Sequence, residues 1–170
     1  MAGSASRSID RIQISPTAMS RQNLITVLYG GFIAGTLDIG AAALINWLSP
    51  FVILQVVARG ALGKASYSGG AYSAALGMLL QWAMSLVIAA IFVFAATRLP
   101  ILRRRWIAAG LAYGVVVFFV MNYVVMPLSR VGSSPHFTVS TFAMNMLAML
   151  LFGGIIAFFA QRFGSAPRDS

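Results

Sequence analysis

Four long apolar segments constrain this chain more than any other feature of its sequence. They cover roughly residues 24–48, 71–97, 106–128 and 139–161. A helix needs about 20 apolar residues to cross the hydrocarbon of a bilayer, and each segment is long enough to do so. Because lipid offers no partner to unpaired backbone groups, all four are expected to be helical. The sequence therefore predicts an all-α integral membrane protein, built as a four-transmembrane-helix bundle.

The composition agrees with this class. The 170 residues are 59% hydrophobic and only 9% charged, whereas a soluble domain is about 25% charged. The chain has no cysteine, which excludes disulfides, thiolate metal ligands and cysteine nucleophiles.

The basic residues form two sets, separated by the apolar segments. One set comprises Arg7, Arg11, Arg21, Arg98, Arg103, Arg104, Arg105, Arg162 and Arg168, and the other comprises Arg59, Lys64 and Arg130. The ratio is nine to three, so the positive-inside rule predicts that both termini are cytoplasmic. The net charge of +9 could suggest nucleic-acid binding in a soluble protein. Here the basic residues lie between apolar segments, which indicates a signal for membrane topology. We therefore expect no nucleic-acid partner.

The two ends of the chain are polar. Residues 1–23 are Ser-rich and aperiodic, which is typical of a disordered tail. We expect this cytoplasmic tail, a transmembrane domain over 24–163 and a short cytoplasmic tail over 164–170. A cleaved secretory signal is the less favoured alternative, because the apolar segment continues past a small-residue site at Ala43 and is interrupted by Asp38.

The external segment between the first two spans is not an ordinary loop. In "SPFVILQVVARGALGKASYSGG", a proline suits a helix start, and Gln55, Arg59 and Gly63 recur every four residues. The sequence predicts an extra amphipathic, non-spanning helix over 51–63. We expect it to lie parallel to the membrane plane, with Arg59 and Lys64 reaching lipid headgroups; partial re-entry into the membrane is the alternative.

One acid lies inside an apolar segment. The chain has three acids, and Asp10 and Asp169 are near its ends, so Asp38 is the exception. On a helix it shares a narrow stripe with Gly31, Gly35 and Ala42. Small residues at this spacing let a neighbouring helix approach closely, so we expect these three to be packing residues and Asp38 to face another helix. A charged Asp at the centre of a span costs about 2.5–3.5 kcal/mol, which favours a paired, hydrated or protonated carboxyl.

The other three spans each carry an amide side chain at a similar depth. These are Gln81, Asn122 and Asn145, each on the outer side of the midpoint of its span. Together with Asp38 they form the candidate polar intramembrane site, with at least one amide expected to reach the carboxyl. The same four groups could instead only hold the helices together through hydrogen bonds.

Familiar catalytic and metal-binding patterns are missing from the sequence. It contains no GxSxG, no P-loop and no HExxH, and His136 is the only histidine. The methionines of "MNMLAM" are better explained as adaptable packing than as copper ligands. We therefore predict no catalytic residue, no metal and no cofactor.

Three segments carry a resemblance to known proteins. They are "GGFIAGTLDIGAAAL", "LQVVARGALGKASYSGG" and "LAYGVVVFFVMNYVVMPLS". Together they resemble small bacterial inner-membrane proteins of unknown function, of the loosely YagU-like kind, over most of residues 24–163. The resemblance implies a four-helix protein of the bacterial inner membrane, and it implies no activity or ligand.

Two functions remain open from the sequence. In the first, Asp38 and its polar neighbours bind a small solute, ion or proton, so the protein is a transporter-like or channel-like unit. In the second, it is a non-catalytic structural or accessory membrane protein that acts through partner proteins or lipid. The lipid bilayer is the expected partner in both cases. A homo-oligomer is also expected for conduction, since four helices make a narrow bundle.

Overall fold

The protein is described by a computed structural model over residues 21–132 and 137–164, and every regular element in these two ranges is helical. The elements are α1 (Arg21–Asn46), α2 (Pro50–Leu62), η1 (Gly63–Tyr67), α3 (Gly70–Arg98), α4 (Pro100–Arg104), α5 (Trp106–Val120), η2 (Met121–Val125), α6 (Met126–Leu128) and α7 (Val139–Phe163). The expected tails over 1–20 and 165–170, and His136, lie outside the described residues. The first helix begins at Arg21, three residues before the predicted start.

Four of the helices are long and apolar enough to cross a membrane. They are α1, α3, α7 and the helix formed by α5, η2 and α6 together, from Trp106 to Leu128. The prediction of an all-α membrane protein with four spanning helices is confirmed, and the predicted segments match the observed helices to within three residues at each end.

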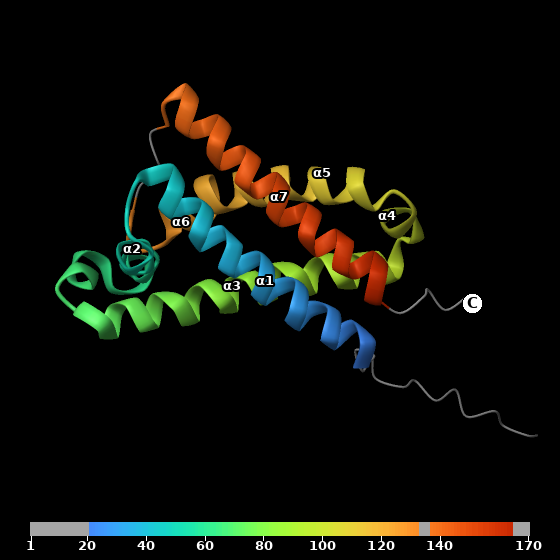
Figure 1. Cartoon of the computed structure of the whole chain (residues 1–170), viewed down its shortest axis with the longest axis horizontal. Coiled ribbons are helices and arrows are strands. Elements are labelled where there is room, and N and C mark those ends of the chain that lie inside the picture. Colours follow the sequence, from blue (N-terminus) through green and yellow to red (C-terminus); the bar gives the residue numbers. More distant parts are fainter. Residues whose placement is uncertain (1–20, 133–136, 165–170) are drawn as a thin grey trace, which may run out of the picture.

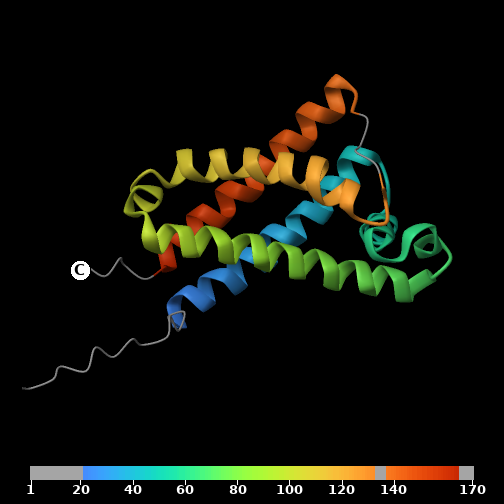
Figure 2. The same ribbon diagram turned by 180° about the vertical axis from the view of Figure 1, so that it is seen from behind.

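The spanning helices form two crossed pairs. In Figure 1, α1 and α7 run diagonally in front of α3 and α5, and Figure 2 shows the same crossing from behind. Among the spanning helices, the most extensive contacts are between α5 and α7, between α7 and α1, and between α1 and α3. The inner faces carry mainly small and aliphatic side chains. Fully or almost fully buried examples are Ala34, Ala89, Ile156 and Ala157.

The two ends of the bundle carry different elements. The start of α1, the short helix α4 and the end of α7 lie together at one end, called here the α4 end (Figure 1). Arg103 Nη2 donates a hydrogen bond of 2.9 Å to Gly164 O, and a Cβ on Gly164 would lie 3.7 Å from Asn23 Oδ1. The opposite end, called the α2 end, carries α2, η1 and α6. The first and last described helices therefore begin and end on the same side of the bundle.

The third spanning helix is not regular, although the sequence predicts one continuous helix over 106–128. Between α5 and α6, the η2 turn is π-helical, and the Met126 N–H bonds to Met121 O five residues back. Pro127 follows directly; its ring lacks an N–H and would clash with a carbonyl in a regular α-helix. The widened turn accommodates the proline without ending the helix.

Glycines bring α5 and α7 into backbone contact. A Cβ on Gly153 of α7 would meet Gly110 O and would lie 2.7 Å from Gly114 N. A Cβ on Gly114 would in turn lie 2.9 Å from Leu150 Cα. Gly110 and Gly114 have the GxxxG spacing that favours close helix pairs in membranes, so this contact could have been predicted from the sequence.

The extra helix between the first two spans is present as α2. Ser49 Oγ accepts a hydrogen bond from Val52 N, and Pro50 occupies the first turn, so the helix begins one residue before the predicted position. Figure 1 shows α2 almost along its axis while α3 runs across the picture, so α2 lies across the bundle end. Gln55, predicted to lie on an exposed polar edge, is instead buried against α3, where it donates to Gly70 O. The predicted exposed position of Gln55 is wrong because α2 packs against α3 on this side of the helix.

Candidate functional site

Asp38 lies between α1 and α3 and is held by one side chain. Gln81 Nε2, on α3, donates a hydrogen bond of 2.8 Å to Asp38 Oδ2. Gln81 is only 8% exposed, and Asp38 is part-buried. Gln81 is one of the three amide partners expected from the sequence. Asp38 and Gln81 are 43 residues apart in the chain, and their hydrogen bond joins two spanning helices.

The glycine stripe of α1 creates this close approach. A Cβ on Gly35 would lie 2.9 Å from Ser85 Cβ, and a Cβ on Gly31 would lie 3.1 Å from Leu86 Cα. Both glycines therefore lie against α3, as the stripe predicted. The same interface carries a ring contact between Phe32 and Trp82, whose centroids are 5.2 Å apart. With the two backbones this close, the short Asp38 side chain reaches Gln81 directly.

The third packing residue lies further toward the α2 end. Ala42 is part-buried and packs beside a small apolar cluster that α1, α2 and α3 share. The buried members of this cluster are Ile39, Ala43, Ile53, Leu54 and Ala74. Ala42 therefore contributes to the junction of three helices, beyond the α1–α3 pair alone.

A second stripe, on α3, extends the polar character of the interface. Ser73, Gly77, Gln81 and Ser85 recur every four residues, and the three polar members are at most 8% exposed. Ser73 Oγ lies 3.5 Å from Gln55 Nε2 of α2. Eight residues of α-helix rise about 12 Å, so Ser73 and Gln81 lie well apart on this face, and Gly77 between them packs against the Leu54 backbone of α2. Ser73 and Ser85 were not among the predicted site residues, although their i, i+4 spacing with Gln81 is visible in the sequence.

The two asparagines of the candidate site are satisfied elsewhere. Asn122 Nδ2 donates to Phe118 O at 2.8 Å, and Asn145 Nδ2 donates to Thr141 O at 2.7 Å. Each bond runs to the preceding turn of its own helix, as asparagine side chains in helices commonly do. Of the four predicted polar residues, hydrogen bonding in the structure joins only Asp38 and Gln81. Equal depth in the membrane is not sufficient, because each asparagine can bond to its own backbone.

The electrostatic setting of Asp38 is unusual within the described ranges. It is the only acid there, and it makes no ion pair with any residue of 21–132 or 137–164. The bond from Gln81 is the only hydrogen bond that these residues give to its carboxyl, and it leaves Oδ1 without a protein donor. In the same ranges, no three His, Cys, Asp or Glu side chains gather in a way that could hold a metal ion. The arrangement suits one proton, one water molecule or one small cation rather than a transition metal.

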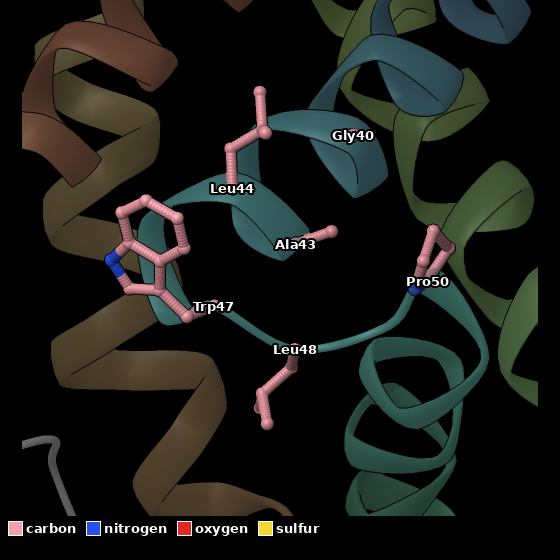
Figure 3. A pocket seen from close by; sticks show the side chains of 6 residues that line it. All are labelled: Gly40, Ala43, Leu44, Trp47, Leu48 and Pro50. Carbon is pink, nitrogen blue, oxygen red and sulfur yellow. The ribbon is translucent and has the colours of Figure 1, made fainter.

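A separate hollow of about 460 Å³ lies at the bend between α1 and α2 (Figure 3). It is apolar and is lined by Gly40, Ala43, Leu44, Trp47, Leu48 and Pro50. Trp47 is 92% exposed and has a φ of 53°, in the left-handed region that a non-glycine residue rarely adopts. Leu48 N donates to Ala43 O at 3.1 Å, so Trp47 occupies the position at a helix end where glycine is usual. The apolar lining matches hydrocarbon, and we assign no polar ligand to this hollow.

Comparisons of the chain with protein-family models, with curated proteins and with solved structures found no match. The resemblance to YagU-like inner-membrane proteins therefore stays an expectation from the sequence. The geometry of Asp38 and its surroundings carries the functional argument.

Proposed function

We propose that the protein is a transporter-like or channel-like membrane unit that takes up a proton or a small cation at Asp38. One observation carries the proposal: the Asp38 carboxyl is held between two spanning helices by a hydrogen bond from Gln81, and no cation among the described residues pairs with it. Ionisable groups inside a membrane are costly, and they commonly mark ion or proton pathways.

Gln81 orients the carboxyl without neutralising it. Its amide donates to Oδ2 and has no charge, so it leaves the carboxyl free to gain or lose a proton. A basic partner would instead have fixed the carboxylate in its charged form. Buried Ser73 and Ser85 lie on the same face of α3 as Gln81, one on each side of it along the helix, so polar groups continue along this face beyond the Asp38–Gln81 pair.

The proposal includes a location and a topology. The protein would be a multi-pass protein of the bacterial inner membrane with both termini in the cytoplasm. Six described basic residues lie at the α4 end and three at the α2 end, which supports a cytoplasmic α4 end. A homo-oligomer would widen the path that a four-helix bundle offers. The apolar surfaces of these helices would otherwise face the lipid bilayer, the partner expected throughout.

Single-cysteine labelling tests this topology, because the native chain has no cysteine. We expect Ser68→Cys, at the α2 end, to react with a membrane-impermeant maleimide in intact cells, and Leu99→Cys, at the α4 end, to react only after permeabilisation. Both native residues are exposed, whereas Ser66 is completely buried and unsuitable for labelling. The reverse pattern would contradict the proposed orientation.

An accessory role is the second candidate, and the Asp38–Gln81 bond also favours it. A carboxyl–amide hydrogen bond can simply lock α1 to α3, and such interhelical bonds contribute about 1 kcal/mol. In this case the carboxyl would not need to ionise, and the protein would act through partner proteins or lipid.

The decisive experiment compares the wild type with Asp38→Asn and Asp38→Leu in proteoliposomes. Asparagine retains an oxygen that can accept the Gln81 hydrogen bond, but it cannot ionise. For a proton or cation site, we expect Asp38→Asn to keep its thermal stability but to lose ion-dependent flux, followed with a pH-sensitive dye inside the vesicles. Thr36→Val, which removes the nearby hydroxyl bonded to Trp82 Nε1, serves as a control that keeps the carboxyl.

The accessory role predicts a different result. Asp38→Asn would then match the wild type in every assay, while Asp38→Leu would destabilise the bundle because Gln81 would lose its acceptor. Infrared spectra offer a second readout, since a titrating carboxyl gives a pH-dependent band that Asp38→Asn removes. Without any Asp38-dependent flux or band, the transport proposal fails.

A further inference from the structure

Three basic side chains at the α2 end have no partner among the residues that the structure describes. Arg59, Lys64 and Arg130 make no side-chain hydrogen bond, ion pair or ring contact with residues 21–132 and 137–164. This end of the described chain also contains no acid, since Asp38 lies between the spanning helices. The cluster formed by these three residues, called here the basic cluster, therefore has no counter-charge from the described protein.

Some arginines at the opposite end contact the protein itself, whereas Arg104 and Arg105 there are exposed and make no such contact with described residues. The Arg98 guanidinium lies 4.8 Å from the centre of the Phe94 ring, and Arg103 donates to Gly164 O. These contacts hold the cations against the protein itself. The basic cluster lacks such contacts, so its charges remain available to an external anion.

Two glycines bring the basic cluster together. The Arg130 N–H donates to Gly60 O at 3.0 Å, and a Cβ on Gly63 would lie 3.9 Å from Arg130 Cβ. Arg130 lies beside the end of α2 and the start of η1. Arg59 directly precedes Gly60, and Lys64 directly follows Gly63. The backbone of Arg130 therefore lies beside the segment that carries Arg59 and Lys64, although Arg130 is 71 residues from Arg59 in the chain.

The side chain of Arg59 has a hydrogen-bond donor without an acceptor. Its Nε is buried and has no hydrogen-bond partner in the structure. Its terminal nitrogens are not buried and bond to no described residue, so they reach the surface. Ser66 Oγ, four residues after α2, is a second buried polar atom without a partner. Buried donors are normally satisfied, and a ligand is one way to satisfy them.

We propose that the basic cluster binds the phosphate of an anionic phospholipid headgroup. Arg59 and Arg130 would supply paired N–H donors suited to phosphate oxygens, and Lys64 would add a mobile charge. The position favours lipid over free phosphate, because α2 lies across the end of the spanning helices, where the headgroups of a surrounding bilayer would lie. Apolar side chains flank the cluster as acyl chains would require: Leu128 is 82% exposed and Tyr67 is 48% exposed. This proposal is independent of the role of Asp38.

Native mass spectrometry of the full-length protein in detergent tests the proposal. The probes are short-chain phosphatidylglycerol and, as a zwitterionic control, phosphatidylcholine with the same acyl chains. We expect the wild type to bind phosphatidylglycerol more tightly, and the double variant Arg59→Gln/Arg130→Gln to lose about fivefold in affinity for each charge removed. The matched control, Arg104→Gln/Arg105→Gln, removes two exposed arginines at the α4 end and should bind as the wild type does.

Several outcomes would overturn the proposal. Equal binding of the two lipids would show that charge does not select the ligand. An equal loss in the Arg104/Arg105 control would show non-specific attraction, and displacement of the lipid by millimolar inorganic phosphate would identify a free anion as the ligand. If the double variant does not fold, Lys64→Gln replaces it. Lys64 is exposed, and its loss should still weaken phosphatidylglycerol binding about fivefold; an unchanged affinity would overturn the proposal.

Discussion

Replacing Gly153 with alanine should separate the two most closely packed helices of the bundle. The new Cβ would meet Gly110 O and would lie 2.7 Å from Gly114 N and 2.9 Å from Gly114 Cα. All three are backbone atoms, so no side-chain rotation can relieve the contact. Carbon atoms prefer separations of about 3.5–4.0 Å, so α5 and α7 must move apart by about 1 Å.

The expected cost follows from two opposing terms. Overpacking of a tight interface costs about 1–3 kcal/mol. Alanine is also a better helix former than glycine by up to about 1 kcal/mol in water, which partly offsets the clash. We therefore expect Gly153→Ala to lower the free energy of unfolding by about 1–2 kcal/mol.

The adjacent glycine provides a matched control. A Cβ on Gly154 would meet nothing within 4 Å, so Gly154→Ala gains the same helix propensity without a clash. Both variants and the wild type would be unfolded by adding SDS to mixed micelles, with helix content followed by circular dichroism. Gly153→Ala should unfold at less SDS than the wild type, and Gly154→Ala at equal or more. If the two variants unfold together, the backbone contact between α5 and α7 does not stabilise the protein as argued.

Three further substitutions test other parts of the structure. Gly77→Ala places a Cβ on the carbonyl of Leu54, so α2 should detach from α3 and exchange its amide hydrogens faster. An unchanged exchange rate would mean that the two helices are not in contact here. Tyr113→Phe removes the 2.7 Å hydrogen bond to Ile88 O and should cost about 1 kcal/mol in the same unfolding assay, while an unchanged transition would mean that the bond does not form in the membrane. Trp47→Gly should stabilise the protein by about 1 kcal/mol because it relieves a left-handed backbone, and a lower melting temperature would show that the exposed ring makes stabilising contacts.

Local features of the sequence determined the number, type and approximate limits of the helices. Length and hydropathy decide which segments can cross a bilayer, and the need to satisfy backbone hydrogen bonds in lipid leaves the helix as the solution. Pro50 marked the start of α2 by the same kind of local chemistry, one residue from the predicted position. The Gly31 and Gly35 stripe also predicted correctly that one face of α1 lies against another helix.

Partner choice depended on the tertiary structure. Asp38 has three possible amide partners by depth, and only the rotation and crossing of the helices bring Gln81 to it while Asn122 and Asn145 bond to their own backbones. The inward orientation of Gln55 arises in the same way, from the position of α3 beside α2. A helix forms through bonds four residues apart, so the sequence alone can predict it. The face that meets a given neighbour depends on contacts between residues far apart in the chain, and these exist only once the bundle is packed.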